Sequence, residues 1–177
     1  MSRQAVSTLV LLLVVLLVLW RMRAGWQART RRSSALVTAL PVAPAALGTE
    51  LLGPVDATYV STTRAGDWLD RVSAHGLGVR SPAQVSVFDT GVRITRTGAT
   101  DVFVPATALR SAAGAPGMAG KVVGGQGLVV LSWQADPADP RGLDTGLRPK
   151  HAADRARLID AVTALTAGHA PAQEENS

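Results

Sequence analysis

The sequence contains no cysteine, and residues 1–32 contain no acidic residue. The first absence excludes disulfide bonds and zinc sites with thiolate ligands, and it is compatible with a reducing compartment. The second absence is accompanied by an excess of arginine over the same stretch: Arg3, Arg21, Arg23, Arg29, Arg31 and Arg32. The basic character of the chain therefore belongs to its N-terminal end.

The remaining residues, 33–177, are close to electrically neutral. They hold 12 basic and 13 acidic residues, a net charge of −1, whereas the whole chain has a net charge of +5. A protein that follows a nucleic-acid backbone needs a basic stripe that neutralises phosphates. Because this part of the chain has no basic excess, we expect no nucleic-acid partner.

An apolar run without charge, glycine or proline extends from Ala5 to Trp20. As a helix it would be about 24 Å long, slightly shorter than a hydrocarbon core of ~30 Å. Flanking residues lengthen it, so we predict a transmembrane helix over 5–22. A cleaved signal peptide is the main alternative, but a small-residue cleavage site is missing and arginines follow the run. A buried core helix is disfavoured because the run has no polar face.

Basic residues are distributed unevenly around this run. Five arginines follow it closely, whereas Arg3 alone precedes it. Because basic residues beside a transmembrane segment tend to stay in the cytoplasm, we expect a single-pass protein of the cell membrane with its N-terminus outside and its domain in the cytoplasm. The predicted membrane-interface residues, which would contact the lipid bilayer, are Trp20, Arg21, Arg23, Trp26, Arg29, Arg31 and Arg32.

The segment after the helix changes character at Ser33. Ser33–Leu47 is small and apolar, and Pro41 and Pro44 prevent one continuous helix, so a linker is expected there. The predicted organisation is a tail at 1–4, the transmembrane helix at 5–22, a basic segment and linker at 23–47, a domain at 48–168 and a disordered tail at 169–177.

Strand-like patterns occupy most of the domain. The clearest is Gln84–Arg96, in which apolar residues alternate with polar ones on both sides of Asp89-Thr90-Gly91, and this predicts a β-hairpin. The other expected strands, of which the first two could be one interrupted strand, are 49–52, 57–63, 101–104, 109–113, 127–133 and 143–147.

Two amphipathic helices are expected. Asp67 opens a short one with Trp68, Leu69 and Val72 on one face and a stop at Gly76. The second covers Lys150–Thr166, with Pro149 in its first turn and Gly168 at its end. Its stripe toward the core comprises Arg155, Leu158, Ile159, Val162 and Leu165. Together these elements predict a mainly-β antiparallel barrel with a C-terminal capping helix that closes one open end.

Several segments resemble a family of actinobacterial membrane-anchored proteins with a pleckstrin-homology-like (PH-like) domain. They are YVSTTRAGDWLDRV, GLGVRSPAQVSVFDTGVRITR, VFVP, APGMAGKVVG, GLVVLSW and LDTGLRPKHAADR. The resemblance runs in order through residues 1–168. It implies a PH-like fold and a membrane location, and it implies little about mechanism.

Patterns that would indicate chemistry are absent or incomplete. Gly114–Lys121 differs from a phosphate-binding loop in its spacing, and Val122 replaces the hydroxyl residue that would hold magnesium. Asp67 and Asp70 are interpreted as a helix N-cap and a solvated side chain. Core packing is favoured over an exposed docking role for Trp68 and Trp133. The histidines, whose spacing matches no metal pattern, are His75, His151 and His169. We predict no catalytic, cofactor-binding or metal-binding residue.

Many PH-like domains bind inositides through clustered lysines and arginines in the loop between their first two strands. This domain has two lysines, and Arg64, Arg71 and Arg80 are scattered. The first hypothesis is therefore a non-enzymatic membrane adaptor whose domain binds an unidentified protein partner. The alternative is a module that binds lipid headgroups or a small ligand at the inner leaflet.

Overall fold

The computed structural model describes residues 11–23, 37, 39–118, 121–122 and 127–169. Residues 11–23 form a helix whose leucine and valine side chains are about half exposed or more. None of the helices in the described part combines the length and the apolar character needed to cross a membrane.

The predicted membrane-interface residues divide between the described and undescribed parts of the chain. Trp20, Arg21 and Arg23 lie in the helix at 11–23 and are exposed. The other members of the set, Trp26, Arg29, Arg31 and Arg32, lie outside the described residues. The predicted tail at 1–4 and residues 5–10 of the predicted transmembrane helix also lie outside them.

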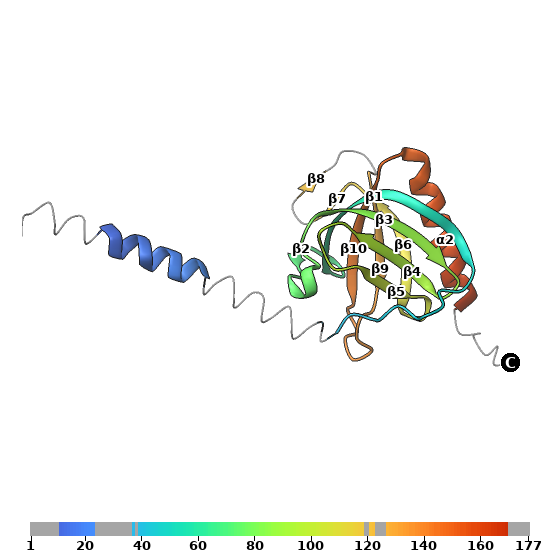
Figure 1. Cartoon of the computed structure of the whole chain (residues 1–177), viewed down its shortest axis with the longest axis horizontal. Coiled ribbons are helices and arrows are strands. Elements are labelled where there is room, and N and C mark those ends of the chain that lie inside the picture. Colours follow the sequence, from blue (N-terminus) through green and yellow to red (C-terminus); the bar gives the residue numbers. More distant parts are fainter. Residues whose placement is uncertain (1–10, 24–36, 38, 119–120, 123–126, 170–177) are drawn as a thin grey trace, which may run out of the picture.

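The domain is an eight-stranded antiparallel sheet that curves around its main apolar core, with helix α2 (Ala152–His169) lying along it (Figure 1). The strand order is β5-β4-β3-β1-β10-β9-β6, and β2 pairs with β1 off this path. The strands are β1 (Glu50–Arg64), β2 (Asp67–Arg71), β3 (Ser81–Phe88), β4 (Gly91–Arg96), β5 (Val102–Pro105), β6 (Leu109–Ala115), β9 (Leu128–Trp133) and β10 (Leu143–Pro149). Two 3₁₀ turns, η1 (Ala74–Gly76) and η2 (Ala106–Ala108), and a small ribbon of β7 (Gly117–Met118) and β8 (Lys121–Val122) complete it.

Strand β1 joins the two halves of the curved sheet. Its first part pairs with β3, its second part pairs with β10, and residues 57–59 pair on both sides. The pairing with β3 shifts register between Leu52 and Val55, around Gly53-Pro54, because proline cannot donate to the ladder. The two segments that the sequence left as one strand or two are therefore one irregular strand.

The predicted β3–β4 hairpin is confirmed. Its alternating residues Val85, Val87, Val92 and Ile94 are fully buried, and Phe88 pairs with Gly91 across a two-residue turn. At Gly91 φ is +150°, and a Cβ there would lie 2.3 Å from the Val104 carbonyl oxygen. Glycine is thus required both by conformation and by the close approach of β5.

The helix predicted from Asp67 is wrong. Gly66, at φ +76°, turns the chain, and β2 then pairs with the end of β1. Asp67 does make the hydrogen bonds of a helix cap, because its Oδ1 accepts from the backbone N–H groups of Leu69 (3.1 Å) and Asp70 (3.2 Å). The Val72 N–H, however, donates to the Thr62 carbonyl of β1 at 2.9 Å. This donor is therefore used in a bond to β1 and not in a helical hydrogen bond.

Helix α2 caps the core as predicted. Leu158, Val162 and Leu165 are buried in the same apolar cluster as the strands, and Ile159 packs against it. The expected position of Pro149 is wrong, because this residue pairs with Ala57 at the end of β10 and the helix begins at Ala152. Gly168 likewise lies inside the last turn of α2.

The segment before β1 contacts the domain. Val37 is 1% exposed and belongs to the core, and Leu40 packs against that core. The Leu47 carbonyl accepts a hydrogen bond from the Thr90 hydroxyl at 2.7 Å. Part of the stretch that the sequence assigned to a linker is therefore packed against the domain.

Candidate functional site

A chain of buried hydrogen bonds runs through the core. The Trp133 indole donates to the Thr145 hydroxyl (2.9 Å), which lies 2.8 Å from that of Thr62, and Thr62 bonds to Tyr59. Tyr59 donates to the Leu77 carbonyl at 3.1 Å. Because one end can only donate and the other can only accept, each hydroxyl proton points from Trp133 toward Leu77. Every member is satisfied, so the chain orders the core and offers no reactive group.

The guanidinium of Arg96 lies over the Tyr59 ring, 3.8 Å from its centroid. It donates to the carbonyls of Gly76, Val79 and Thr100 and to the Ser81 hydroxyl. Burial lowers the pKa of Arg96 and raises that of Tyr59 to about 12. Tyr59, with its raised pKa, is neutral near neutral pH. Arg96 holds the 76–79 turn against β4.

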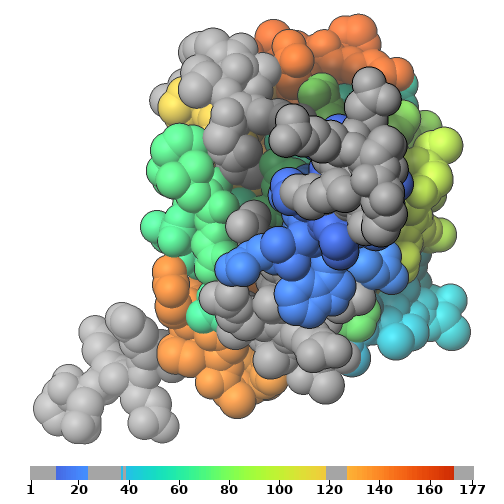
Figure 2. All heavy atoms as spheres, turned by 90° about the vertical axis from the view of Figure 1, so that its left-hand side faces the viewer, coloured from blue at the N-terminus to red at the C-terminus, as the bar shows by residue number. Residues whose placement is uncertain are grey.

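The β1–β2 hairpin carries the first candidate interaction surface. Thr63 pairs with Arg71 and its neighbour Arg64 pairs with Asp67, so residues 68–70 have no counterpart on β1. We call residues 68–70 the β2 bulge. Trp68 is 53% exposed and Leu69 is 63% exposed. Figure 2 shows this segment, in green, at the surface beside the orange β9–β10 connection, consistent with a hydrogen bond from Arg141 to the Ala65 carbonyl.

These exposures decide between the two interpretations of the tryptophans. Trp133 is fully buried, which confirms its predicted core position. Trp68 is exposed, so the preference for core packing at this residue is wrong. The physical reason is the bulge, because extra residues on one strand of a pair project away from the ladder.

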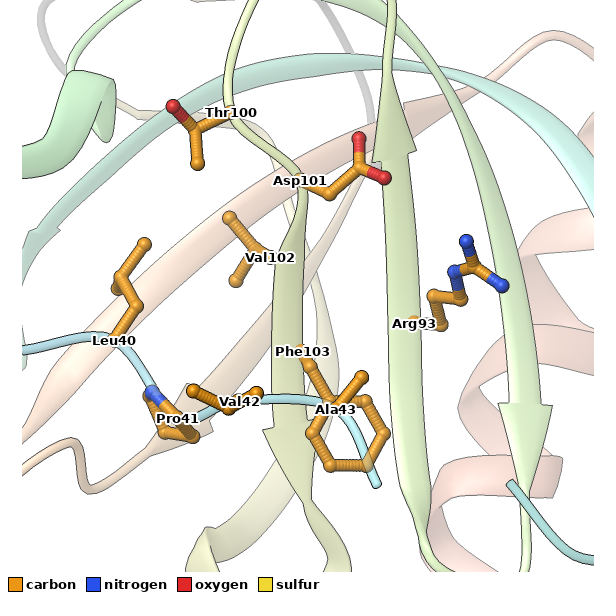
Figure 3. Close-up of a pocket in the computed structure, with 9 residues that line it drawn as sticks. All are labelled: Leu40, Pro41, Val42, Ala43, Arg93, Thr100, Asp101, Val102 and Phe103. Atoms are coloured by element: carbon orange, nitrogen blue, oxygen red, sulfur yellow. The ribbon is translucent and has the colours of Figure 1, made fainter. Parts of the chain in front are cut away.

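The second candidate surface is a groove of about 300 Å³ between the segment 40–43 and strands β4 and β5. Figure 3 shows the segment 40–43 passing across β5, with the Phe103 ring toward Ala43. The groove wall is mainly apolar, from Leu40, Val42, Val102 and Phe103, and Arg93 and Asp101 provide its charged groups. We call this the β5 groove.

Comparison with known families identifies the domain. Residues 37–163 match the family described as Bacterial PH domain-like. The chain belongs to this family. The matched stretch begins at Val37, which belongs to the core of the domain. PH-like domains commonly bind lipids or proteins and are generally non-enzymatic, so the chain carries a domain of a class used for protein or lipid interaction.

No match was found among curated proteins. Among solved structures, a chain of "The 8S snRNP Assembly Intermediate" is similar over 78% of this chain and 97% of its own length, with 11% sequence identity and a TM-score of 0.49.

Among the described residues, Arg64, Arg71, Arg80 and Arg96 do not all converge on one site. Arg64 is buried and forms an ion pair with Asp139 at 3.2 Å, and Arg96 is buried in the core. Arg71 and Arg80 are exposed on either side of η1. Of the three arginines that are scattered in the sequence, Arg64 remains apart from the other two in the structure. Arg71 and Arg80 both flank the turn that follows β2.

Two of the three histidines have a ring nitrogen close to a backbone carbonyl. His75 Nε2 lies 2.8 Å from the Val37 carbonyl oxygen, and His169 Nδ1 lies 3.0 Å from that of Leu165. His151 is exposed just before α2. Within the described ranges, no three histidine, aspartate or glutamate side chains gather in a way that could hold a metal ion. Gly114, in the segment tested for a phosphate loop, lies in strand β6.

Sequence reasoning missed the β5 groove, and for Trp68 of the β2 bulge it preferred core packing over an exposed docking role. The β5 groove depends on residues 40–43 folding back over β5, which no periodic pattern signals. The β2 bulge was hidden by a helix-like spacing of Trp68, Leu69 and Val72. One signal was available: Ala65-Gly66 between two apolar segments is a possible hairpin turn.

Proposed function

We propose that this protein is a non-enzymatic adaptor, held at the cytoplasmic face of the cell membrane, whose PH-like domain binds an extended apolar segment of a partner protein in the β5 groove. The observation that carries the proposal is the groove itself. It combines an apolar wall with Arg93 and Asp101 at one edge of the sheet. Apolar surface would supply affinity, and the two charges would orient the bound segment.

The position of β5 supports an extended ligand. β5 is the last strand of the sheet order, so among the described strands it pairs only with β4. A strand that pairs on one side only can accept the backbone of another chain, while neighbouring pockets select its side chains. The groove has room for a few side chains, which suits a short linear segment better than a folded surface.

Membrane attachment is supported by the uncharged run at 5–20 and the arginines that follow it. The part of this run that is described is helical, with exposed apolar side chains. The attachment and its direction are tested by fusing reporters after Ser177. A reporter that works only in the cytoplasm should give signal, and one that requires export should not. The reverse pattern would place the domain outside.

The binding site is tested by photocrosslinking in living cells. A photoreactive amino acid replaces Val42, which is 88% exposed in the groove wall, or, as a control, Ala164 on the outer face of α2. We expect one discrete protein adduct from position 42 and none from position 164. Adducts of equal pattern at both positions would mean that the groove is not the partner site.

A small apolar ligand is the second candidate for the groove. Its volume lies at the lower end of the ~300–1,000 Å³ range of small-molecule sites. Native mass spectrometry of the purified full chain separates the two. A reproducible added mass that is lost in Val42→Arg would indicate a ligand, whereas a bare chain with position-42 adducts in cells would indicate a protein.

A further inference from the structure

The β2 bulge exposes a tryptophan and a leucine side by side. It interrupts a strand pair, since Thr63 and Arg64 are adjacent on β1 while their partners Arg71 and Asp67 are four residues apart. Asp67 fixes the shape of the bulge, because its carboxylate accepts the N–H groups of Leu69 and Asp70. An apolar pair is therefore presented on a defined backbone at the surface.

A third apolar residue lies nearby. Val79 is 53% exposed, on the turn that follows η1. The Arg71 stem lies against this turn, because a Cβ built on Gly78 would be 3.1 Å from Arg71 Cδ. The exposed patch thus runs from the β2 bulge to Val79, with Arg71 between them.

The N-terminal segment enters the domain beside this patch. The Val37 carbonyl lies 2.8 Å from His75 Nε2, and His75 belongs to η1, which directly follows β2. Val37 itself is 1% exposed, so the entry point is fixed in the core. Residues 24–36 separate it from the helix at 11–23. Even fully extended, they span no more than about 50 Å, so a membrane anchor would keep the domain within that distance of the bilayer, with the chain entering on this side.

The chemistry of the patch fits the interfacial layer of a bilayer. Tryptophan is enriched at membrane–water interfaces because its ring is apolar and its N–H is polar. The exposed charged residues around it are of both signs, Arg71 and Arg80 against Asp70. Contact would therefore come mainly from apolar insertion and would depend little on salt.

The geometry points to the lipid bilayer as the occupant of this patch: Trp68 and Leu69 insert among the lipid headgroups and fix which side of the domain faces the membrane. This inference rests on the membrane attachment proposed above and is independent of what binds the β5 groove. It assigns to the β2 bulge a role that the scattered basic residues do not supply.

The absence of cysteine gives a direct test. Leu69→Cys in the full chain is labelled with an environment-sensitive fluorophore, and Thr163→Cys, exposed on α2, is the matched control. Both are reconstituted into vesicles of phosphatidylcholine and phosphatidylglycerol, with and without lipid carrying a doxyl quencher near the headgroup. We expect a blue-shifted emission and severalfold quenching at position 69 and neither effect at position 163. Equal, water-like emission at both positions would overturn the inference.

Flotation of the same vesicles separates this inference from the attachment on which it rests. If the chain floats and the probe at position 69 stays in water, attachment stands and bilayer contact fails. If the chain does not float, both fail. If the probe is in water in pure vesicles but shielded in native membranes, the patch docks a protein and the lipid assignment is wrong.

A second pair of variants guards against misfolding. A fluorophore on Val79→Cys should also show blue-shifted emission in vesicles, and adding Trp68→Ser to that variant should return the emission to that of a probe in water. Thermal unfolding should stay unchanged, because Trp68 is exposed. Asp70→Ser should leave the probe shifted. A probe at position 79 that ignores Trp68→Ser would show that Trp68 does not hold the patch in the bilayer.

Discussion

The two hairpins β1–β2 and β3–β4 each have a positive-φ glycine in or next to the turn, yet they use their apolar residues in opposite ways. In β3–β4 the apolar residues alternate strictly, the register is unbroken and the inward side chains are fully buried. In β1–β2 the two adjacent residues Trp68 and Leu69 cannot both face a core, because neighbours on a strand point to opposite sides. The chain resolves this with a bulge that exposes both. The β3–β4 hairpin contributes to the core, and the β1–β2 hairpin presents a surface.

The largest expected contrast is in stability. Ile94→Ala removes a fully buried side chain from β4 and should lower the free energy of unfolding by about 2–5 kcal/mol. Leu69→Ala in the β2 bulge should change it by no more than ~0.5 kcal/mol. Denaturant titration of the full chain in detergent measures both. Comparable losses would mean that the bulge packs against the domain after all.

Arg96 links the two hairpins, since it extends from β4 to the carbonyls of Gly76 and Val79 beyond β2. Arg96→Met keeps much of the stem but leaves these carbonyls without their donor. We expect a loss of about 3 kcal/mol, as for buried hydrogen bonds to a charged group. Faster hydrogen exchange at residues 76–80 than in β4 would locate the loss. A uniform change would argue against a local link.

Tyr59 makes the base of the β1–β2 hairpin sensitive to alkaline pH. Its pKa is raised to about 12 in the folded protein, so the neutral form is favoured by folding. The stability it contributes is complete below about pH 10, the unfolded pKa, and is lost as pH rises toward 12; the loss would approach about 2–3 kcal/mol. Because Tyr59 is the single tyrosine, tyrosinate absorbance reports it directly. A midpoint near 10 in the folded chain would contradict its burial.

The smallest expected effect distinguishes the two turns. Gly66 and Gly91 both have positive φ, but a Cβ on Gly66 meets nothing within 4 Å, whereas one on Gly91 meets the Val104 carbonyl at 2.3 Å. Gly66→Ala should therefore cost only the left-handed conformation, about 1–2 kcal/mol. Gly91→Ala should cost more, because β5 must also move. Thermal unfolding of both variants measures the two losses of stability. Equal losses would mean that β5 can move away from a Cβ at position 91 without a measurable free-energy cost.

How much could be predicted from the sequence follows from the same contrast. Alternation located the β3–β4 hairpin, and 3.6-residue spacing located Leu158, Val162 and Leu165 on α2, because both patterns face one core. The pattern at Trp68, Leu69 and Val72 also has helical spacing, but only Val72 is buried. Spacing records which residues are apolar and does not record whether a core lies beside them.

Other differences arise from contacts between distant parts of the chain. Pro149 is compatible both with a first helical turn and with the end of a strand, and its pairing with Ala57 decides for the strand. Val37 packs in the core, and its carbonyl lies 2.8 Å from His75 Nε2 of η1. The membrane-interface residues and the direction of insertion stay predictions, since they depend on a bilayer and not on contacts within the chain.

The attachment of Val37 to η1 has a mechanical consequence. Leu40 packs on the same core and the Leu47 carbonyl accepts a hydrogen bond from Thr90, so this stretch is held at several points. Because residues 40–43 form a wall of the β5 groove, the contact between Val37 and His75 helps to keep that groove formed when the chain is pulled from its N-terminal side.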